Sequence, residues 1–561
     1  GFYAWDPSDG NYLVGIKAID NARLYNQDQM PESMKEHKAR NNYYMLPFLF
    51  GLLGLLFHLS KRPNEFLGLL ALFIITGIGI IIYSNQPPNE PRERDYVLVG
   101  SFFTYCIWIG MAVLALFEIF RERLNFGGNG GAIAAVALVA IAPLLMGFEN
   151  FDDHSRRHHS GARDYANNFL ESCEDNAIIF TYGDNDTYPL WYAQEVEGIR
   201  TDVRVVNLSL ISVDWYIDQL RRKVNNSPKI KMTIPREEYR GKKRNQVFYP
   251  GQGQENPTDL RNLIRFIGES HPLPLQGGKQ TESYMPTRKV FLPVDRRKIA
   301  ENKVIDLQDS TIRVPDRLDF TIPKNALIKG DLAVLDIVAS NMWDRPIYFA
   351  VTCRKESLLG MDDFLQLEGL ALKLVPTKTK SDGRFGIIGS GRVASDIVYD
   401  NLMNRFRWGN FDKKDLFVDR SYGPSVQSHH AVILRTSEDL IRRGKQDKAV
   451  ALMEKYFEVF PSMNFTYDYR TFQMLALMIQ AGGYDKAKPH IKELALETAD
   501  HLEFFYSLDP EDLEAGFAQD FSLYNRAKDD MLRVLAQQGD TAFEDEIKAL
   551  LEPYNVDRLK N

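Results

Sequence analysis

Three groups of polar residues have types and spacing that could carry chemistry. The members of the first are Asp184, Asn185, Asp186, Tyr188 and Trp191. Short acidic and amide side chains hydrogen-bond sugar hydroxyls or coordinate Ca²⁺, and aromatic rings stack on a pyranose face, so this group could contact a sugar or an acceptor. The commoner interpretation is that Asp186 or Thr187 caps the following helix and that the aromatic residues belong to the core.

The second group lies in the loop NQPPNEPRERDY, residues 85–96. Arg92 and Arg94 could clamp the phosphate of a lipid carrier, because a guanidinium fork matches phosphate oxygens bidentately. Glu93 and Asp95 would then be supporting acids. The alternative is a network of arginines and acids that ties the loop to the polar part of the chain.

The third group is the cluster DDHSRRHH, residues 152–159. His154 and His158 are four residues apart and would share one face of a helix, a spacing that binds Zn²⁺ when a carboxylate is the third ligand. Arg156 and Arg157 beside them would repel a dication. We therefore predict no metal site here, and expect a solvated cluster or one that faces lipid headgroups.

Four apolar runs lie between residues 44 and 148, and begin near Met45, Phe66, Val97 and Ala132. Each is long enough to cross a hydrocarbon core of about 30 Å, the shorter ones with local thinning. Four crossings place residues 1–43 and the large polar part on one side of the membrane. Counting Lys and Arg in the loops does not fix the orientation of the spans. We favour a cytoplasmic location for the side that carries Lys61, Arg62, Arg121 and Arg123, with the large polar part on the outside.

Residues 149–428 have the pattern of an α/β domain. From Asn167 to about Arg222 the sequence alternates helix, strand, helix, strand and helix, which predicts a βαβ unit and a parallel sheet. Further strands are expected at KVFLPVD, STIRVPD and RPIYFAVTC, with a helix at DLAVLDIVASN. The acidic group 184–186 follows the first strand, at the end where open α/β sheets usually bind ligands.

Residues 429–561 have helical periodicity throughout. The string Asp-Lys-Ala occurs at Asp447 and again at Asp485, each time at the start of the second helix of a pair. This repetition resembles tetratricopeptide helical hairpins, with a spacing slightly longer than usual. We expect two such pairs and a third over residues 529–551.

Composition limits the remaining possibilities. The 561 residues have a net charge of −7, which argues against a nucleic-acid-binding protein. Three cysteines are too few for a disulfide scaffold, and Cys106 is expected to act as a small hydrophobe. Cys173 and Cys353 flank strands, where we expect packed thiols, with a disulfide as the alternative. The chain begins with neither Met nor a signal peptide, and we expect a carboxy-terminal fragment.

Several strings resemble the carboxy-terminal half of a membrane family of unknown function that is related to transmembrane protein O-mannosyltransferases of the GT-C glycosyltransferase superfamily. They are QPPNEPRERDYVLVGSF (86–102), ENFDDHSRRHHSGARDYANNFL (149–170) and NAIIFTYGDNDTYPLWYAQEVEGIRTDVRVVNLSL (176–210). DWYIDQLRRKV, RPIYFAVT and the terminal helices also fit. Phe151 and Ser155 depart from the expected pattern, where relatives tend to have Trp and Asp.

The resemblance implies a multi-pass protein of a bacterial inner membrane whose polar domain faces the periplasm. It implies transfer of a sugar, mannose first, from a polyprenyl-phosphate carrier to Ser or Thr of exported proteins, without a cofactor. The general base of such enzymes lies in an early extracytoplasmic loop, so the resemblance assigns that role to no residue of this sequence.

Two alternatives remain open on the sequence. One is a non-enzymatic membrane scaffold that binds envelope proteins through its helical repeats. The other is a metal-dependent hydrolase centred on Asp184 and Asp186.

Overall fold

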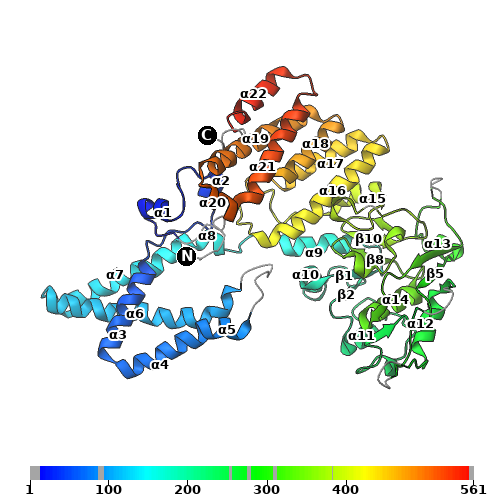
Figure 1. Cartoon of the computed structure of the whole chain (residues 1–561), viewed down its shortest axis with the longest axis horizontal. Helices are drawn as coiled ribbons and strands as arrows, with labels where there is room; N and C mark the ends of the chain where they lie inside the picture. The colour runs from blue at the N-terminus through cyan, green and yellow to red at the C-terminus, as the bar shows by residue number, and fades with distance from the viewer. Residues whose placement is uncertain are drawn as a thin grey trace. The chain divides into compact units, whose positions relative to one another are not determined.

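The computed structural model describes residues 13–85, 94–251, 256–274, 280–307, 312–381 and 383–554 (Figure 1). Its contacts divide the chain into two compact units. The membrane unit contains the described residues up to Arg156 and those from Leu494 onward, and the α/β unit is Arg157–Glu493. The long helix α19 (Tyr484–Ser507) begins in the α/β unit and ends in the membrane unit.

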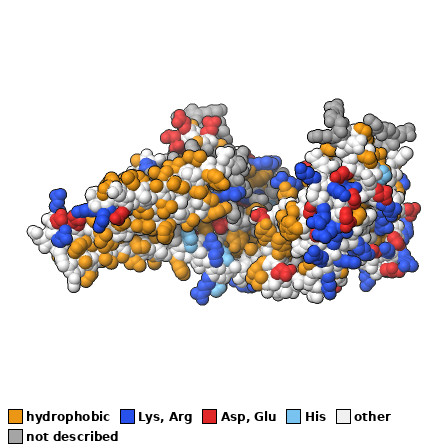
Figure 2. All heavy atoms as spheres, turned by 90° about the horizontal axis from the view of Figure 1, so that it is seen from below, with side chains coloured by type: hydrophobic (Ala, Val, Ile, Leu, Met, Phe, Trp, Pro, Cys, Tyr) orange, Lys and Arg blue, Asp and Glu red, His pale blue; other side chains and the backbone are white. Residues whose placement is uncertain are grey.

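The apolar runs of the membrane unit fold as long helices. Three helical segments have the length and composition of membrane spans: Pro63–Ser84, Tyr96–Arg123 and Gly128–Glu149. They contain α4 (Pro63–Ile74), η2 (Ile75–Gly79), α5 (Ile80–Ser84), η3 (Asp95–Leu98), α6 (Val99–Arg123) and α7 (Gly128–Glu149). The predicted first span folds as α3 (Leu46–Lys61), which at 16 residues is shorter. Hydrophobic side chains cover the surface of these helices (Figure 2).

Helices α3 and α6 run parallel and pack closely. The Tyr105 hydroxyl donates to the carbonyl of Phe48 (2.7 Å), and Lys61 forms an ion pair with Glu118 at the other end. Between these points, Gly54 lies against the backbone of Trp108. Small residues allow this approach, as is usual between membrane helices. The Trp108 indole donates to Nδ1 of the buried His58 (3.3 Å).

The segment before α3 packs on the last helices of the chain. It contains α1 (Lys17–Arg23) and α2 (Glu32–Lys35), and the last helices are α20 (Pro510–Asp512), η10 (Leu513–Phe517), α21 (Ala518–Leu535) and α22 (Thr541–Leu551). Tyr25 and Met30 are buried in one hydrophobic cluster with Phe504 and Phe517. The Ser33 hydroxyl donates to Glu497 (2.5 Å). Sequence patterns did not predict this contact, because it joins residues more than 450 positions apart.

A six-stranded mixed sheet forms the centre of the α/β unit, in the order β11-β9-β10-β8-β1-β2. Its strands are β1 (Ile178–Thr181), β2 (Arg204–Asn207), β8 (Ile347–Ala350), β9 (Leu365–Leu367), β10 (Ala371–Leu374) and β11 (Arg392–Val393). The adjacent strands β2, β1 and β8 are parallel. The first two are linked by α10 (Gly183–Glu195), which confirms the predicted βαβ unit. The preceding helix is α9 (Gly161–Glu171), and α11 (Asp214–Leu220) follows β2.

Two smaller sheets and several helices complete the α/β unit. The strands are β3 (Gln246–Phe248), β4 (Thr258–Asp259), β5 (Lys289–Pro293), β6 (Arg317–Thr321) and β7 (Ala326–Ile328). The helices are α12 (Leu260–Gly268), α13 (Arg296–Glu301), α14 (Lys329–Asn341) and α15 (Ser395–Asp400). The strand predicted at STIRVPD is wrong: residues 312–316 have no regular structure, and β6 begins at Arg317. A proline at position 315 cannot donate a ladder hydrogen bond.

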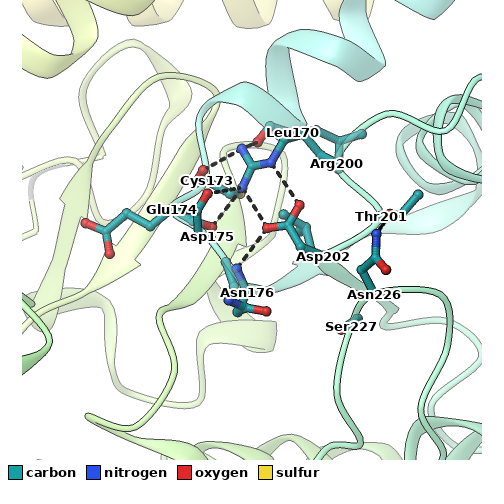
Figure 3. Close-up of polar contacts among 12 residues, drawn as sticks. Leu170, Cys173, Glu174, Asp175, Asn176, Arg200, Thr201, Asp202, Asn226 and Ser227 are labelled. Atoms are coloured by element: carbon teal, nitrogen blue, oxygen red, sulfur yellow. Dashed lines mark hydrogen bonds and ion pairs between the residues drawn. The ribbon is translucent and has the colours of Figure 1, made fainter.

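The amino ends of β1 and β2 are held by Arg200 (Figure 3). Its guanidinium donates to the carbonyls of Leu170 and Cys173, both at 2.9 Å, and pairs with Asp202 (3.0 Å). Asp202 in turn accepts from the backbone of Asn176 (2.8 Å). These bonds satisfy carbonyl groups at the end of α9. The polar groups at the amino edge of the sheet therefore have a structural role.

The predicted terminal helices are present. They are α16 (Gly423–Arg442), α17 (Gln446–Val459), α18 (Tyr469–Gln480) and α19, and α16, α17 and α18 pack together. Asp447 and Asp485 both lie in first turns, of α17 and α19. Their likeness to tetratricopeptide hairpins stays a prediction.

All three cysteines are free. Cys106 is exposed on α6, whereas Cys173 and Cys353 are buried and their thiols donate to carbonyls of Phe169 and Phe180. The expected packed thiols are confirmed, and burial raises the pKa of each.

Candidate functional site at the carboxyl edge of the sheet

The three parallel strands bring polar side chains together at their carboxyl ends. Strand β1 is followed by Asp186, β8 by Thr352, and β2 ends at Asn207. Because β1 lies between β8 and β2, these residues meet at one edge although they come from distant parts of the sequence. This is the edge at which open parallel sheets bind ligands.

Helix α10 begins earlier than the sequence indicated. Its first residue is Gly183, whose φ of +75° suits glycine and turns the chain sharply out of β1. Asp184 and Asn185 are therefore exposed in the first turn, while Asp186 points inward and is only 6% exposed. The predicted cap by Asp186 or Thr187 is wrong, since no side chain caps α10 and both residues lie inside the helix.

Asp186 is a buried carboxyl group that accepts a hydrogen bond from the hydroxyl of Thr352. Burial raises the pKa of Asp186 to about 6, although the hydrogen bonds to it act in the opposite direction. Near neutral pH this group changes between a proton donor and a proton acceptor. Asp184, two residues earlier on the same helix, is exposed. The hydrolase alternative centred on the two aspartates stays a prediction.

A hydrogen-bond network behind Asp186 fixes the edge. The Thr187 hydroxyl contacts the Thr181 hydroxyl at 2.7 Å and the Asn207 amide at 3.0 Å. The Asn207 side chain also accepts from the backbone of Ser209 (2.7 Å), and so sets the turn after β2. Sequence reasoning missed Thr181, Asn207 and Thr352. The one feature of the sequence that could have identified them is that each is a polar residue at or just beyond the end of a predicted strand.

The aromatic residues beside Asp186 are not core residues, and that interpretation is corrected. Tyr188 is 53% exposed and stacks on the partly buried Trp191, with 5.5 Å between ring centroids. Tyr182 is also exposed, and the Arg354 guanidinium lies over its ring at 5.1 Å. Tyr188 and Tyr192 are four residues apart and both exposed, so they share the outer face of α10.

The remaining predicted site residues are not brought to this edge by any described contact. Arg92 and Glu93 lie outside the described residues, as does the side chain of Asp95. Arg94 is described and exposed, immediately before η3. The predicted shared helix face of His154 and His158 is wrong: α8 (Phe151–His154) ends at His154, and His158 has a φ of +69°. Among the described residues, no three His, Cys, Asp or Glu side chains are grouped as metal ligands.

The edge thus offers a carboxyl group that titrates near neutrality, surface amide and carboxylate groups, and exposed rings. Such a combination hydrogen-bonds hydroxyl groups and stacks on apolar sugar faces.

Comparison with known proteins is consistent with this chemistry. Residues 162–396 match the family model of TMEM260-associated domain 2, a segment that contains the whole edge. A stretch of 84 residues is 29% identical to the protein O-mannosyl-transferase TMEM260 of Mus musculus. That stretch covers 14% of this chain and 12% of the mouse protein. No solved structure matches the chain. The chain is therefore similar, over limited segments, to a protein O-mannosyltransferase.

Proposed function

We propose that this chain is part of a membrane glycosyltransferase, which moves a sugar from a polyprenyl-phosphate carrier to Ser or Thr of exported proteins. Mannose is the first candidate because the mouse relative is named for mannosyl transfer. The observation that carries the proposal is the buried Asp186, with its raised pKa, beside exposed aromatic rings within the matched segment.

In this proposal Asp186 binds a hydroxyl group of the sugar or the acceptor. A buried carboxyl group that is half ionised near pH 6 accepts a hydrogen bond in one state and donates in the other. Tyr188 and Trp191 stack on the ligand, and Asp184 and Asn185 hydrogen-bond its outer hydroxyls. We assign no general base to a described residue.

The donor phosphate is proposed to lie at Arg92 and Arg94, with Glu93 and Asp95 as supporting acids. Support comes from chemistry alone: arginine is the side chain best matched to phosphate, and charged residues beside a membrane are costly unless they are used. The loop joins two of the three candidate spans, which is where a lipid-linked phosphate would be met.

We further propose that α3 crosses the membrane, making four spans. The contact of Tyr25 and Met30 with Phe504 and Phe517 supports this, since residues before α3 and after α7 that touch must lie on one side. That requires an even number of crossings, and three other helices have the length to cross. We propose a bacterial inner membrane with this shared side in the periplasm.

The test is transfer of labelled mannose from polyprenyl-phosphate mannose to exported protein, using the native protein in its own membranes. Asp186→Asn is expected to reduce transfer at least tenfold, and Trp191→Ala similarly, because each removes a ligand contact. The matched control is Asp175→Asn, which changes a carboxylate that is 93% exposed at the opposite edge. Full transfer by Asp186→Asn, with normal protein levels, would refute the role of this edge.

A further inference from the structure

A basic segment follows the parallel strands on the surface of the α/β unit. Residues 221–244 contain ten Lys or Arg and only two Glu, in a chain whose net charge is −7. Arg222, Lys223, Arg240 and Lys242 are all exposed. Arg244 is the exception, because it is buried and donates to the carbonyl of Ile267 (2.7 Å).

This segment is held rigidly against α11. Asp214 accepts from the backbone of Gly241 (2.5 Å) and from Lys329 (2.6 Å), and Lys329 also donates to the carbonyl of Gly241 (2.9 Å). One turn further along α11, Asp218 binds Arg236 and Tyr239. Arg240 and Lys242 flank the fixed Gly241, so their positions beside the start of α11 are set by the fold.

An exposed aromatic residue follows Asp214, the residue that binds Gly241 between these two bases. Trp215 follows Asp214 in α11 and is 57% exposed. Its ring contacts Tyr216, which contacts Trp191, which stacks on Tyr188, so a row of rings connects Trp215 to the candidate site. On the face of the α/β unit seen in Figure 2, hydrophobic side chains and a group of Lys and Arg lie next to each other.

We propose that Trp215, with Arg240 and Lys242, docks the α/β unit on the surface of a bilayer that contains anionic lipid. Trp and Tyr favour the headgroup region because one end of the ring is apolar and the other polar. Lys and Arg beside them are attracted to anionic headgroups. An acidic protein surface would also attract these bases, and lipid exposure of position 215 distinguishes the bilayer from such a partner.

The connection to the membrane helices allows this docking. Helix α7 ends at Glu149 and α9 begins at Gly161. Because the linking residues 150–160 include the short helix α8, they span at most about 30 Å. Helix α9 packs on α10, which carries the near end of the row of rings. Docking would hold the candidate site beside the lipid, where a lipid-linked sugar is met. The docking itself does not depend on sugar transfer.

The experiment measures lipid exposure at position 215 in the full chain. Trp215→Cys, in a Cys106→Ser background, is spin-labelled and reconstituted into nanodiscs; Cys173 and Cys353 are buried and stay unlabelled. Collision rates are compared for oxygen, which enters lipid, and a water-soluble nickel chelate. Met463→Cys, at a residue that is 49% exposed in the same unit, is the matched control.

In discs containing phosphatidylglycerol, the label at 215 is expected to collide with oxygen severalfold more than with nickel, and the label at 463 to show the reverse. Arg240→Glu with Lys242→Glu, or about 1 M salt, which shortens the Debye length to about 3 Å, should return position 215 to the control value. Equal nickel exposure at both positions would overturn the proposal. The proposal would also fail if the label at 215 were protected from nickel in purely zwitterionic discs and stayed protected after the charge reversal. It would fail as well if protection from nickel required an added acceptor peptide.

Discussion

The hydroxyl of Thr352 donates a hydrogen bond to the carboxyl group of Asp186, and joins the ends of strands β8 and β1. The two residues are separated by 166 positions in the sequence. One hydroxyl does not offset the loss of hydration of a carboxylate, so Asp186 retains a proton more readily than an exposed aspartate. Burial of this carboxyl group at the sheet edge is unfavourable for its ionised form, and perturbed groups of this kind cluster at functional sites. The proposed function rests on this feature.

Asp186→Asn is expected to stabilise the protein at pH 8. Since burial raises the pKa from 3.8 to about 6, the aspartate favours folding below pH 3.8 and loses that contribution as the pH rises through 6. Asparagine still accepts from Thr352 and carries no charge. We expect a gain of about 1–3 kcal/mol at pH 8 that disappears near pH 4, measured by thermal unfolding in detergent. Destabilisation at pH 8 would show that the carboxylate is a structural anchor.

Acid should destabilise the terminal helices through buried histidines. His429, His430 and His501 each have a pKa lowered from 6.5 to about 4 by burial. The unfolded chain therefore binds more protons between these values, and stability is lost as the pH falls from 6.5 to 4. At pH 5.5 each histidine accounts for about 1.4 kcal/mol of that loss.

The measurement is the unfolding midpoint between pH 7 and 5.5. His429→Gln keeps groups able to bond Asn168 and the carbonyl of Ser425, and should reduce the acid loss at pH 5.5 by about 1.4 kcal/mol. An unchanged pH dependence in this variant would mean that His429 is not the neutral, buried group described here.

Gly54→Ala should separate α3 from α6. A Cβ at Gly54 would lie 1.7 Å from the carbonyl oxygen of Trp108, so the backbones would have to move apart. Gly110→Ala is the control, because a Cβ at that helical glycine meets nothing within 4 Å. We expect Gly54→Ala to lose at least about 2 kcal/mol of stability, or the folded protein altogether, and Gly110→Ala to be neutral. Equal behaviour of the two variants in thermal unfolding would contradict the packing of α3 on α6.

Much of the architecture followed from periodicity, whereas the site followed only in part. Apolar runs gave the membrane helices, and alternating strand and helix patterns gave the β1–α10–β2 unit, because local hydrophobic order decides these elements. The orientation of α10 was not predictable: a start at Gly183, three residues before Asp186, decides which side chains are buried. The contacts of Thr352 with Asp186 and of Tyr25 with Phe504 join residues far apart in the sequence. Local sequence patterns cannot predict such contacts.

Four crossings can be tested by labelling single cysteines from one side of sealed vesicles, in a Cys106→Ser background. Glu36→Cys, before α3, should be labelled from the same side as Met463→Cys in the α/β unit. Glu122→Cys, at the end of α6, should be labelled only from the other side. If Glu36→Cys were labelled together with Glu122→Cys, three crossings would be correct and the four-span proposal would fail.

The most direct test of the proposed function is a hydrogen-exchange footprint of the chain in nanodiscs, with and without polyprenyl-phosphate mannose and an acceptor peptide. We predict that substrate slows exchange in residues 182–192, and that Asp186→Asn abolishes the effect while Asp175→Asn leaves it intact. Substrate binding that leaves residues 182–192 unchanged would contradict the assignment of this edge as the functional site.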